Sequence, residues 1–167
     1  MSARAALWRA AAAAARAGRQ AALATVSRRR GSLPMASDAK LLIEADGQRM
    51  GTVGGGCLEA DVTAQALEVI ETGQPAVVRH TLNADVAGDL GLSCGGTVEL
   101  FLEPVIPGAE AAALYAAIAT AIGTRTRATV LTALDWTDGP RKALHVGDAT
   151  HTLGDWPAAP AAPAAPA

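Results

Sequence analysis

The sequence predicts an α/β fold, in which a single domain holds a mixed sheet of about six to seven strands with flanking helices. Segments with apolar residues at helical spacing alternate along the chain with short segments of strand-forming residues. Glycine and proline separate these segments, as expected at turns. The 167 residues suffice for one domain with one hydrophobic core. We assign this domain to residues 1–150, and a flexible, disordered Pro/Ala-rich tail to residues 151–167.

The first expected element is an alanine-rich helix, which ends at Gly18 because glycine commonly terminates helices. Further on, Asp46-Gly47 predicts a hairpin, since this dipeptide favours the tight turn between two antiparallel strands. The expected elements of this half are a helix over residues 3–17, strands over 21–28, 40–45 and 50–53, and a helix over 57–72.

The helix over residues 57–72 carries the clearest pattern in the chain. Gly73 and Pro75 are predicted to end it. Five apolar residues recur along it at helical spacing: Leu58, Val62, Ala66, Val69 and Ile70. The remaining expected elements are strands over 76–82 and 97–102, a helix over 109–122, and a closing hairpin of 127–134 and 141–146.

Composition excludes several classes of function. A net charge of -2 and an aromatic content of 3% argue against nucleic-acid binding, which uses basic surfaces and stacking side chains. No run approaches the roughly 18 apolar residues of a membrane span. The two cysteines are too few for a secreted disulfide scaffold, so we expect a reducing, cytoplasmic setting. No Ser-His-Asp order or pair of acids indicates a hydrolytic enzyme.

The most informative segment is Gly51–Ala60, where a strand enters three successive glycines and a helix leaves them. Glycines allow positive φ and a close approach of other groups to the backbone. A helix start presents unpaired N–H groups and the positive end of the helix dipole, which favours an anion such as phosphate. The alternative is a tight turn without a ligand, and Glu59 supports it, because a carboxylate in the first helical turn already uses the dipole.

Two thiols lie beside glycines. Cys57 is placed at the helix start, which favours thiol chemistry, and Cys94 begins a second glycine-rich turn with Gly95 and Gly96. We expect both cysteines on the same side of the domain. The alternative for each is a small buried hydrophobic residue. Two cysteines alone do not complete a zinc site, which takes four ligands, so any metal held by Cys57 and Cys94 stays unknown.

Basic residues give weaker candidates. On a strand, Arg28 and Arg30 point to one face and Arg29 to the other. Such arginines can clamp a phosphate through two hydrogen bonds each, although a run of this kind is more often a solvated strand end. Lys40 is a similar candidate.

Three segments together resemble the N-terminal domain of the XdhC/CoxI family. They are ATVSRRRGSLP at 24–34, DGQRMGTVGGGCLEADV at 46–62 and GLSCGGTVELFLEPV at 91–105. The order and spacing of the Gly-Ser-x-Pro, Gly-Gly-Gly-Cys-x-Glu and Cys-Gly-Gly motifs carry the resemblance, which covers roughly residues 5–105. The family's usual Gly-x-Lys-Met stands here as Asp38-Ala39-Lys40-Leu41.

The resemblance implies an accessory protein, and not an enzyme, that binds the molybdenum cofactor (molybdopterin) transiently. It implies help with sulfuration of the cofactor by a cysteine desulfurase and with insertion into an apo molybdenum hydroxylase of the xanthine dehydrogenase or carbon monoxide dehydrogenase type. A separate Rossmann-domain chain is a further candidate partner, and we expect a homo-oligomer. The cofactor-binding residues so implied are Ser32, Gly54, Gly55, Gly56, Cys57, Glu59, Cys94, Gly95 and Gly96.

Two other functions stay open on the residues alone. The first is a thiol-dependent sulfur-transfer or redox enzyme that uses Cys57 and Cys94. The second is a protein-interaction module that holds no cofactor. Copurification of a molybdopterin separates the proposed chaperone from the interaction module, and sulfur loading on either cysteine favours the enzyme.

Overall fold

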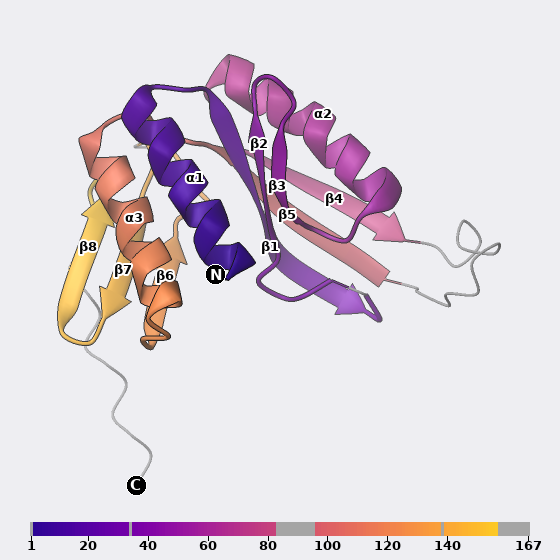
Figure 1. Cartoon of the computed structure of the whole chain (residues 1–167). Coiled ribbons are helices and arrows are strands. Elements are labelled where there is room, and N and C mark those ends of the chain that lie inside the picture. The colour runs from indigo at the N-terminus through magenta and orange to yellow at the C-terminus, as the bar shows by residue number, and fades with distance from the viewer. Residues whose placement is uncertain (1, 34, 83–95, 138, 157–167) are drawn as a thin grey trace, which may run out of the picture.

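A computed structural model describes residues 2–33, 35–82, 96–137 and 139–156. These residues form three helices and eight strands, and the strands make two antiparallel sheets of five and three strands (Figure 1). The α/β class predicted from the sequence is confirmed. The arrangement differs from a single mixed sheet, because no helix in the described ranges connects two neighbouring parallel strands, as a mixed sheet would require.

The larger sheet has the strand order β3-β2-β1-β5-β4. The predicted turn at Asp46-Gly47 joins β2 to β3, and Gly47 adopts a φ of +84° there. Strand β1 is longer than predicted and contains a bulge between Val26 and Arg28, which lets its end continue along β5. The bounds of the five strands are β1 Ala21–Gly31, β2 Lys40–Glu44, β3 Arg49–Thr52, β4 Ala76–Leu82 and β5 Gly96–Pro104.

Helix α2 (Gly56–Thr72) covers one face of the larger sheet. Its apolar stripe is the one that the sequence predicts, and the same stripe is buried. The residues that pack across this interface include Leu58, Val62, Ala66 and Val69 of the helix and Ala22, Ala24, Leu41, Ile43, Val98, Leu100 and Leu102 of the strands. The helix is therefore fixed by burial of one face, which leaves its glycine-rich start at the rim of the sheet.

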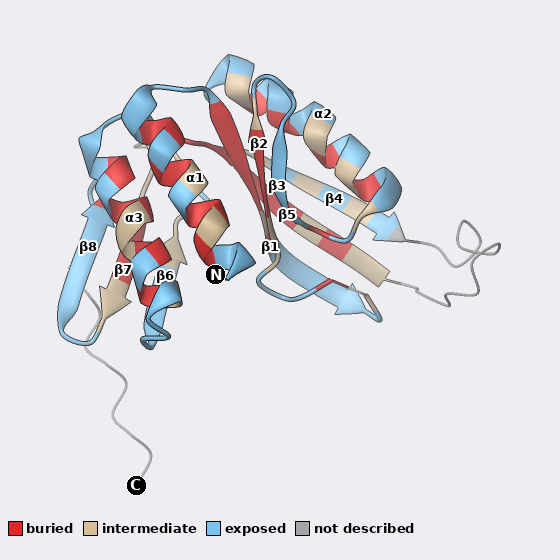
Figure 2. Ribbon diagram, in the orientation of Figure 1, coloured by how far each residue is buried: buried red, intermediate tan, exposed pale blue. Residues whose placement is uncertain are grey.

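Helices α1 (Ala3–Ala17) and α3 (Ala109–Gly123) pack against each other and cover part of the opposite face of this sheet. Figure 2 shows the consequence along β1, which is buried at its start and exposed at its end. Alanines at the contact, Ala11, Ala12 and Ala15 of α1 among them, are buried and let the two helices approach closely. The alanine-rich sequence of α1 is thus a packing surface.

The smaller sheet follows α3 and consists of β6 (Ala128–Thr132), β7 (Lys142–Val146) and β8 (Ala149–Leu153). Strand β8 was not predicted from the sequence. Its Leu153 and Leu144 of β7 join the core formed by α1 and α3. Lys142 of β7 also forms a buried ion pair with Glu103 of β5, with 2.8 Å between Nζ and Oε1. This pair and the shared core connect the two sheets.

Candidate functional site

The glycine loop, Gly54–Gly56, carries the chain from β3 into α2. All three glycines adopt positive φ, at +131°, +77° and +59°. An L-amino acid rarely adopts such angles, so three glycines in succession are needed for this sharp change of direction. A Cβ added to Gly55 would meet no atom within 4 Å, so the loop has an open side at this residue.

The carboxylate of Glu59 already binds backbone N–H groups of the glycine loop and of the residue before it. Its Oε1 accepts hydrogen bonds from the backbone N–H of Val53 at 3.2 Å and of Gly55 at 3.1 Å, and from the Thr52 hydroxyl at 2.5 Å. Partial burial raises the pKa of Glu59, but these hydrogen bonds and the charge of Arg49 outweigh it, so the pKa lies below its ordinary value. A phosphate would have to displace this carboxylate to use the same N–H groups.

A cavity of about 780 Å³ opens beside the glycine loop. Gly54 and Gly55 form part of its rim, and α1, α3, β6 and the segment before β2 supply most of the walls. The walls are largely apolar: Leu7, Trp8, Met35, Ile118, Ile122, Val130 and Leu144. A cavity of this size and character is typical of sites for small organic ligands.

Three charged residues line the cavity: Arg4 and Asp38, which form an exposed ion pair with each other, and Lys40. The Nζ of Lys40 donates a hydrogen bond to the Thr25 hydroxyl at 3.0 Å and lies 5.7 Å from the centre of the Trp8 ring. Among the described residues, no carboxylate oxygen lies within 4.0 Å of this Nζ. Burial, and next the nearby charge of Lys142, lower the pKa of Lys40 to about 8. Near neutral pH the side chain is therefore a mainly charged ammonium, without a direct carboxylate partner among the described residues, beside a largely apolar space.

A second lysine approaches the same tryptophan. Lys142 Nζ lies 6.0 Å from the centre of the Trp8 ring, but it pairs with Glu103 and also donates to the Thr132 hydroxyl at 2.6 Å. The side chains of Lys142 and Glu103 are only 3% and 5% exposed. This lysine is satisfied inside the protein, so we assign it a structural role.

The structure brings only some of the sequence-predicted residues to the cavity. Cys57 is an exposed free thiol in the first turn of α2, and Ser32 is exposed after β1; neither belongs to the described lining of the cavity. Gly96 faces β1, where a Cβ would lie 2.4 Å from the Arg30 carbonyl oxygen, so this glycine allows close strand pairing. Cys94 and Gly95 lie outside the described residues, and so does any juxtaposition of Cys94 with Cys57.

Sequence reasoning missed Trp8, which lines the cavity and lies near both lysines. The signal was available, because Trp8 is a large aromatic residue within an alanine-rich helix. Such a residue packs where the small neighbours leave room.

Among the described residues, no three His, Cys, Asp or Glu side chains gather to hold a metal ion. None of the helices in the same ranges combines the length and hydropathy of a membrane crossing.

In a comparison with known protein families, residues 14–81 match the model of the XdhC and CoxI family. The chain is 33% identical over 85 residues to the molybdenum cofactor insertion chaperone PaoD of Escherichia coli K12, which covers 51% of this chain and 26% of PaoD. It is also 33% identical over 81 residues to the uncharacterized protein YqeB of the same organism, which covers 48% of this chain and 15% of YqeB.

One solved structure shares the fold over nearly the whole chain. It is a crystal structure described as a xanthine dehydrogenase from Bacillus halodurans, with a TM-score of 0.69 and 24% sequence identity. The match covers 95% of this chain and 46% of that chain. At this identity the likeness concerns the fold alone. The chain spans less than half the length of each of these three proteins.

Proposed function

We propose that this chain binds the molybdenum cofactor transiently and assists its insertion into a molybdenum hydroxylase, because residues 14–81 match the model of the XdhC and CoxI family. The observation that carries the proposal is Lys40, an ammonium without a carboxylate partner among the described residues, in the wall of a largely apolar cavity. The name of PaoD, a molybdenum cofactor insertion chaperone, supports the same function.

The cavity suits a flat organic cofactor that ends in a phosphate. Apolar walls accept the ring system, and a cation is the usual partner of the phosphate. Lys40 supplies that cation, while the open side of Gly55 leaves the backbone accessible at the rim. Largely apolar walls with one ammonium that lacks a direct carboxylate partner give moderate affinity, because the other lining cation, Arg4, is paired with Asp38. Moderate affinity suits a protein that must release its ligand.

The proposal includes the finer steps that the family resemblance implies. These are sulfuration of the bound cofactor by a cysteine desulfurase and delivery to an apo-enzyme of the xanthine dehydrogenase or carbon monoxide dehydrogenase type, in the cytoplasm. The exposed thiol of Cys57, which follows the glycine loop directly, is available for contact with a partner or with sulfur. A separate Rossmann-domain chain and a second copy of this chain remain candidate partners.

The experiment is to co-express the chain with the machinery that makes the cofactor, purify it, oxidise it and measure pterin fluorescence. Two variants of α1 form a matched pair: Ala3→Trp adds a bulky side chain to the cavity wall, whereas Ala13→Trp adds it to an exposed position of the same helix. We expect Ala3→Trp to lose most of the bound pterin and Ala13→Trp to retain it.

Two outcomes would contradict the proposal. The unmodified protein could carry no pterin at all, which would favour an interaction module without cofactor. Alternatively, both variants could retain pterin equally, which would place the cofactor elsewhere on the molecule. Thermal unfolding of each variant shows whether a loss of pterin reflects loss of the fold.

A further inference from the structure

Three arginines gather on the five-stranded sheet, and none of them lines the cavity or belongs to the glycine loop. Arg28 of β1, Arg30 of β1 and Arg79 of β4 line a hollow of about 270 Å³ together with Thr81, Thr97 and Glu99. Val98 and Leu100 of β5 pack beneath α2, so the alternating residues Thr97 and Glu99 point to the opposite face. We call these six residues the arginine cluster.

Strand register arranges the cluster in two rows. In the first row, Glu99 lies between Arg28 and Arg79, its direct neighbours on the two adjacent strands. In the second row, Thr97 lies between Arg30 and Thr81 in the same way. Rows two residues apart along a strand are separated by about 6.5–7 Å, which is within reach of an arginine side chain.

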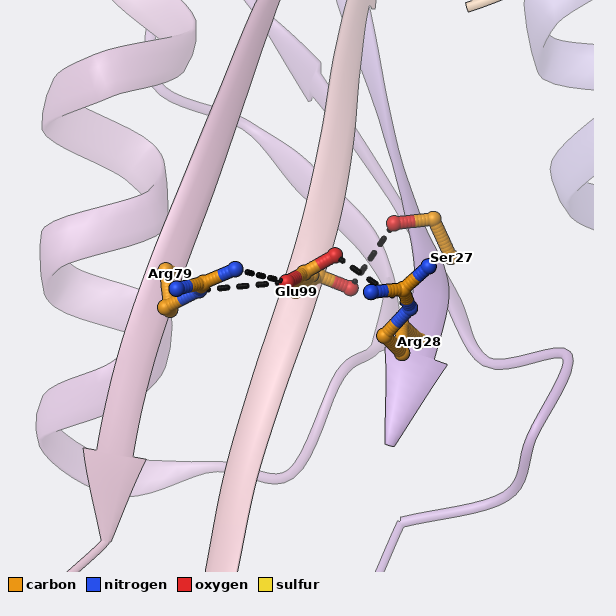
Figure 3. A network of polar contacts seen from close by, with 4 residues as sticks. All are labelled: Ser27, Arg28, Arg79 and Glu99. Carbon is orange, nitrogen blue, oxygen red and sulfur yellow. Dashed lines mark hydrogen bonds and ion pairs between the residues drawn. The ribbon is translucent and has the colours of Figure 1, made fainter. Parts of the chain in front are cut away.

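The first row is held in place by ion pairs. Figure 3 shows Arg79 and Arg28 on either side of Glu99. Arg79 donates to Glu99 Oε1 from both Nε, at 3.1 Å, and Nη2, while Arg28 Nε lies 3.7 Å from Oε2. The Arg79 hydrogen bond holds the pKa of Glu99 below its ordinary value, so the carboxylate stays charged. Glu99 thus orients two guanidinium groups without neutralising both.

The second row contains a positive charge, that of Arg30, without an ionic partner among the described residues. The Arg30 side chain makes no ion pair or hydrogen bond within the described residues, and it lies beside the Thr97 and Thr81 positions. Among the six described residues of the cluster, three arginine charges less the one of Glu99 leave a net charge of +2. Arg29, between the two, points to the other face, where its Nη1 donates to the Met35 carbonyl.

We propose that the arginine cluster binds a phosphate group, free or as a phosphate monoester, with Arg30 and the two threonine hydroxyls as its direct contacts. Guanidinium groups and hydroxyls are the side chains that most often donate to phosphate oxygens. The hollow has the size of a small ligand, and its donors converge from three strands, which favours a compact anion over the flat surface of an acidic protein. No residue lines both this hollow and the cavity, so this inference stands independently of the proposed function.

The test is to titrate the purified chain with inorganic phosphate, pyrophosphate and a nucleoside monophosphate. Binding is measured by amide NMR shifts and by calorimetry. Low ionic strength is needed, because salt screens exposed charges. We expect saturable binding with shifts on β1, β4 and β5. Arg30→Gln should weaken binding at least tenfold, Thr97→Val two- to fivefold, and Arg16→Gln, an exposed arginine of α1, less than twofold.

Arg79→Lys adds a readout of geometry, because it keeps the charge but loses the two-pronged contact that positions Glu99. An affinity between those of the unmodified protein and Arg30→Gln supports the built site. Tighter binding of the monophosphate than of inorganic phosphate identifies a phosphorylated small molecule, and equal binding identifies free phosphate. Equal losses in Arg30→Gln and Arg16→Gln, or preferred binding of a glutamate-rich peptide that phosphate does not displace, would overturn the proposal.

Discussion

The two lysines near the Trp8 ring show how the same type of side chain can stabilise the fold in one place and be free for a ligand in another. Lys142 reaches the ring from the smaller sheet and pairs with Glu103 in the interior. Lys40 reaches it from the larger sheet, has the Thr25 hydroxyl as its hydrogen-bond partner and lines the cavity. The difference lies in where the carboxylate is. A lysine that pairs with a carboxylate inside the protein, as Lys142 does, is part of the fold. A lysine without such a carboxylate, as Lys40 is, can pair with the anionic group of a ligand.

The largest effect is expected on the Lys142 side. Lys142→Met leaves the Glu103 carboxylate buried without a partner, and breaking a buried pair in this way costs about 3–5 kcal/mol. Urea unfolding of the variant measures the loss. Arg19→Gln is the control, since it breaks the more exposed pair with Glu44 and should cost at most about 1 kcal/mol. Equal losses in the two variants would show that the buried pair is not what connects the sheets.

A smaller effect, of the opposite kind, is expected on the Lys40 side. Lys40→Met removes a cation whose charge is disfavoured by burial, so the free energy of unfolding should stay the same or rise slightly. Retention of pterin should fall about tenfold or more, because a hydrogen bond to a charged group contributes about 1.5–3 kcal/mol. Pterin fluorescence and urea unfolding of one preparation measure both. A destabilised variant that still retains pterin would reverse the roles assigned to the two lysines.

Local features of this fold could be predicted from the sequence, because their signals lie within a few residues of one another. The periodicity of α2, the Asp46-Gly47 turn and the glycine loop are of this kind. The alternation of Arg28, Arg29 and Arg30 along a strand is another, although the bulge that keeps β1 paired with β5 left no sequence signal.

The cavity could not be predicted, because it depends on pairings between distant segments. Nothing in the sequence connects Glu103 to Lys142, and without that pair Lys40 cannot be distinguished as the lysine that lacks a carboxylate. Glu59 is an intermediate case. Its position in the first turn of α2 indicated that it would compete with an anion, and the structure adds the three donors that it binds.

A third effect is a difference in pH dependence, and it tests the comparison without any ligand. In the folded protein Lys40 has a pKa of about 8, against the ordinary value of 10.5 expected in the unfolded chain. Between these values the unfolded chain binds more protons than the folded one, so this group makes the free energy of unfolding rise as pH increases. The penalty of burying the charge is complete below pH 8 and disappears toward pH 10.5.

Other groups also titrate in this range, so the measurement must be a difference. Burial, and next the charge of Glu103, raise the pKa of Tyr115, which makes stability fall as pH rises above the ordinary tyrosine value. That contribution is common to the unmodified protein and to Lys40→Met, and it cancels when urea unfolding of the two is compared at pH 7, 9 and 10.

We expect the unmodified protein to gain stability relative to the Lys40→Met variant as the pH rises across these values. Anion binding at Lys40 should weaken over the same range, because the ammonium is lost, so stability and binding move in opposite directions. A difference that does not change with pH would mean that Lys40 keeps its proton in the folded protein over this range.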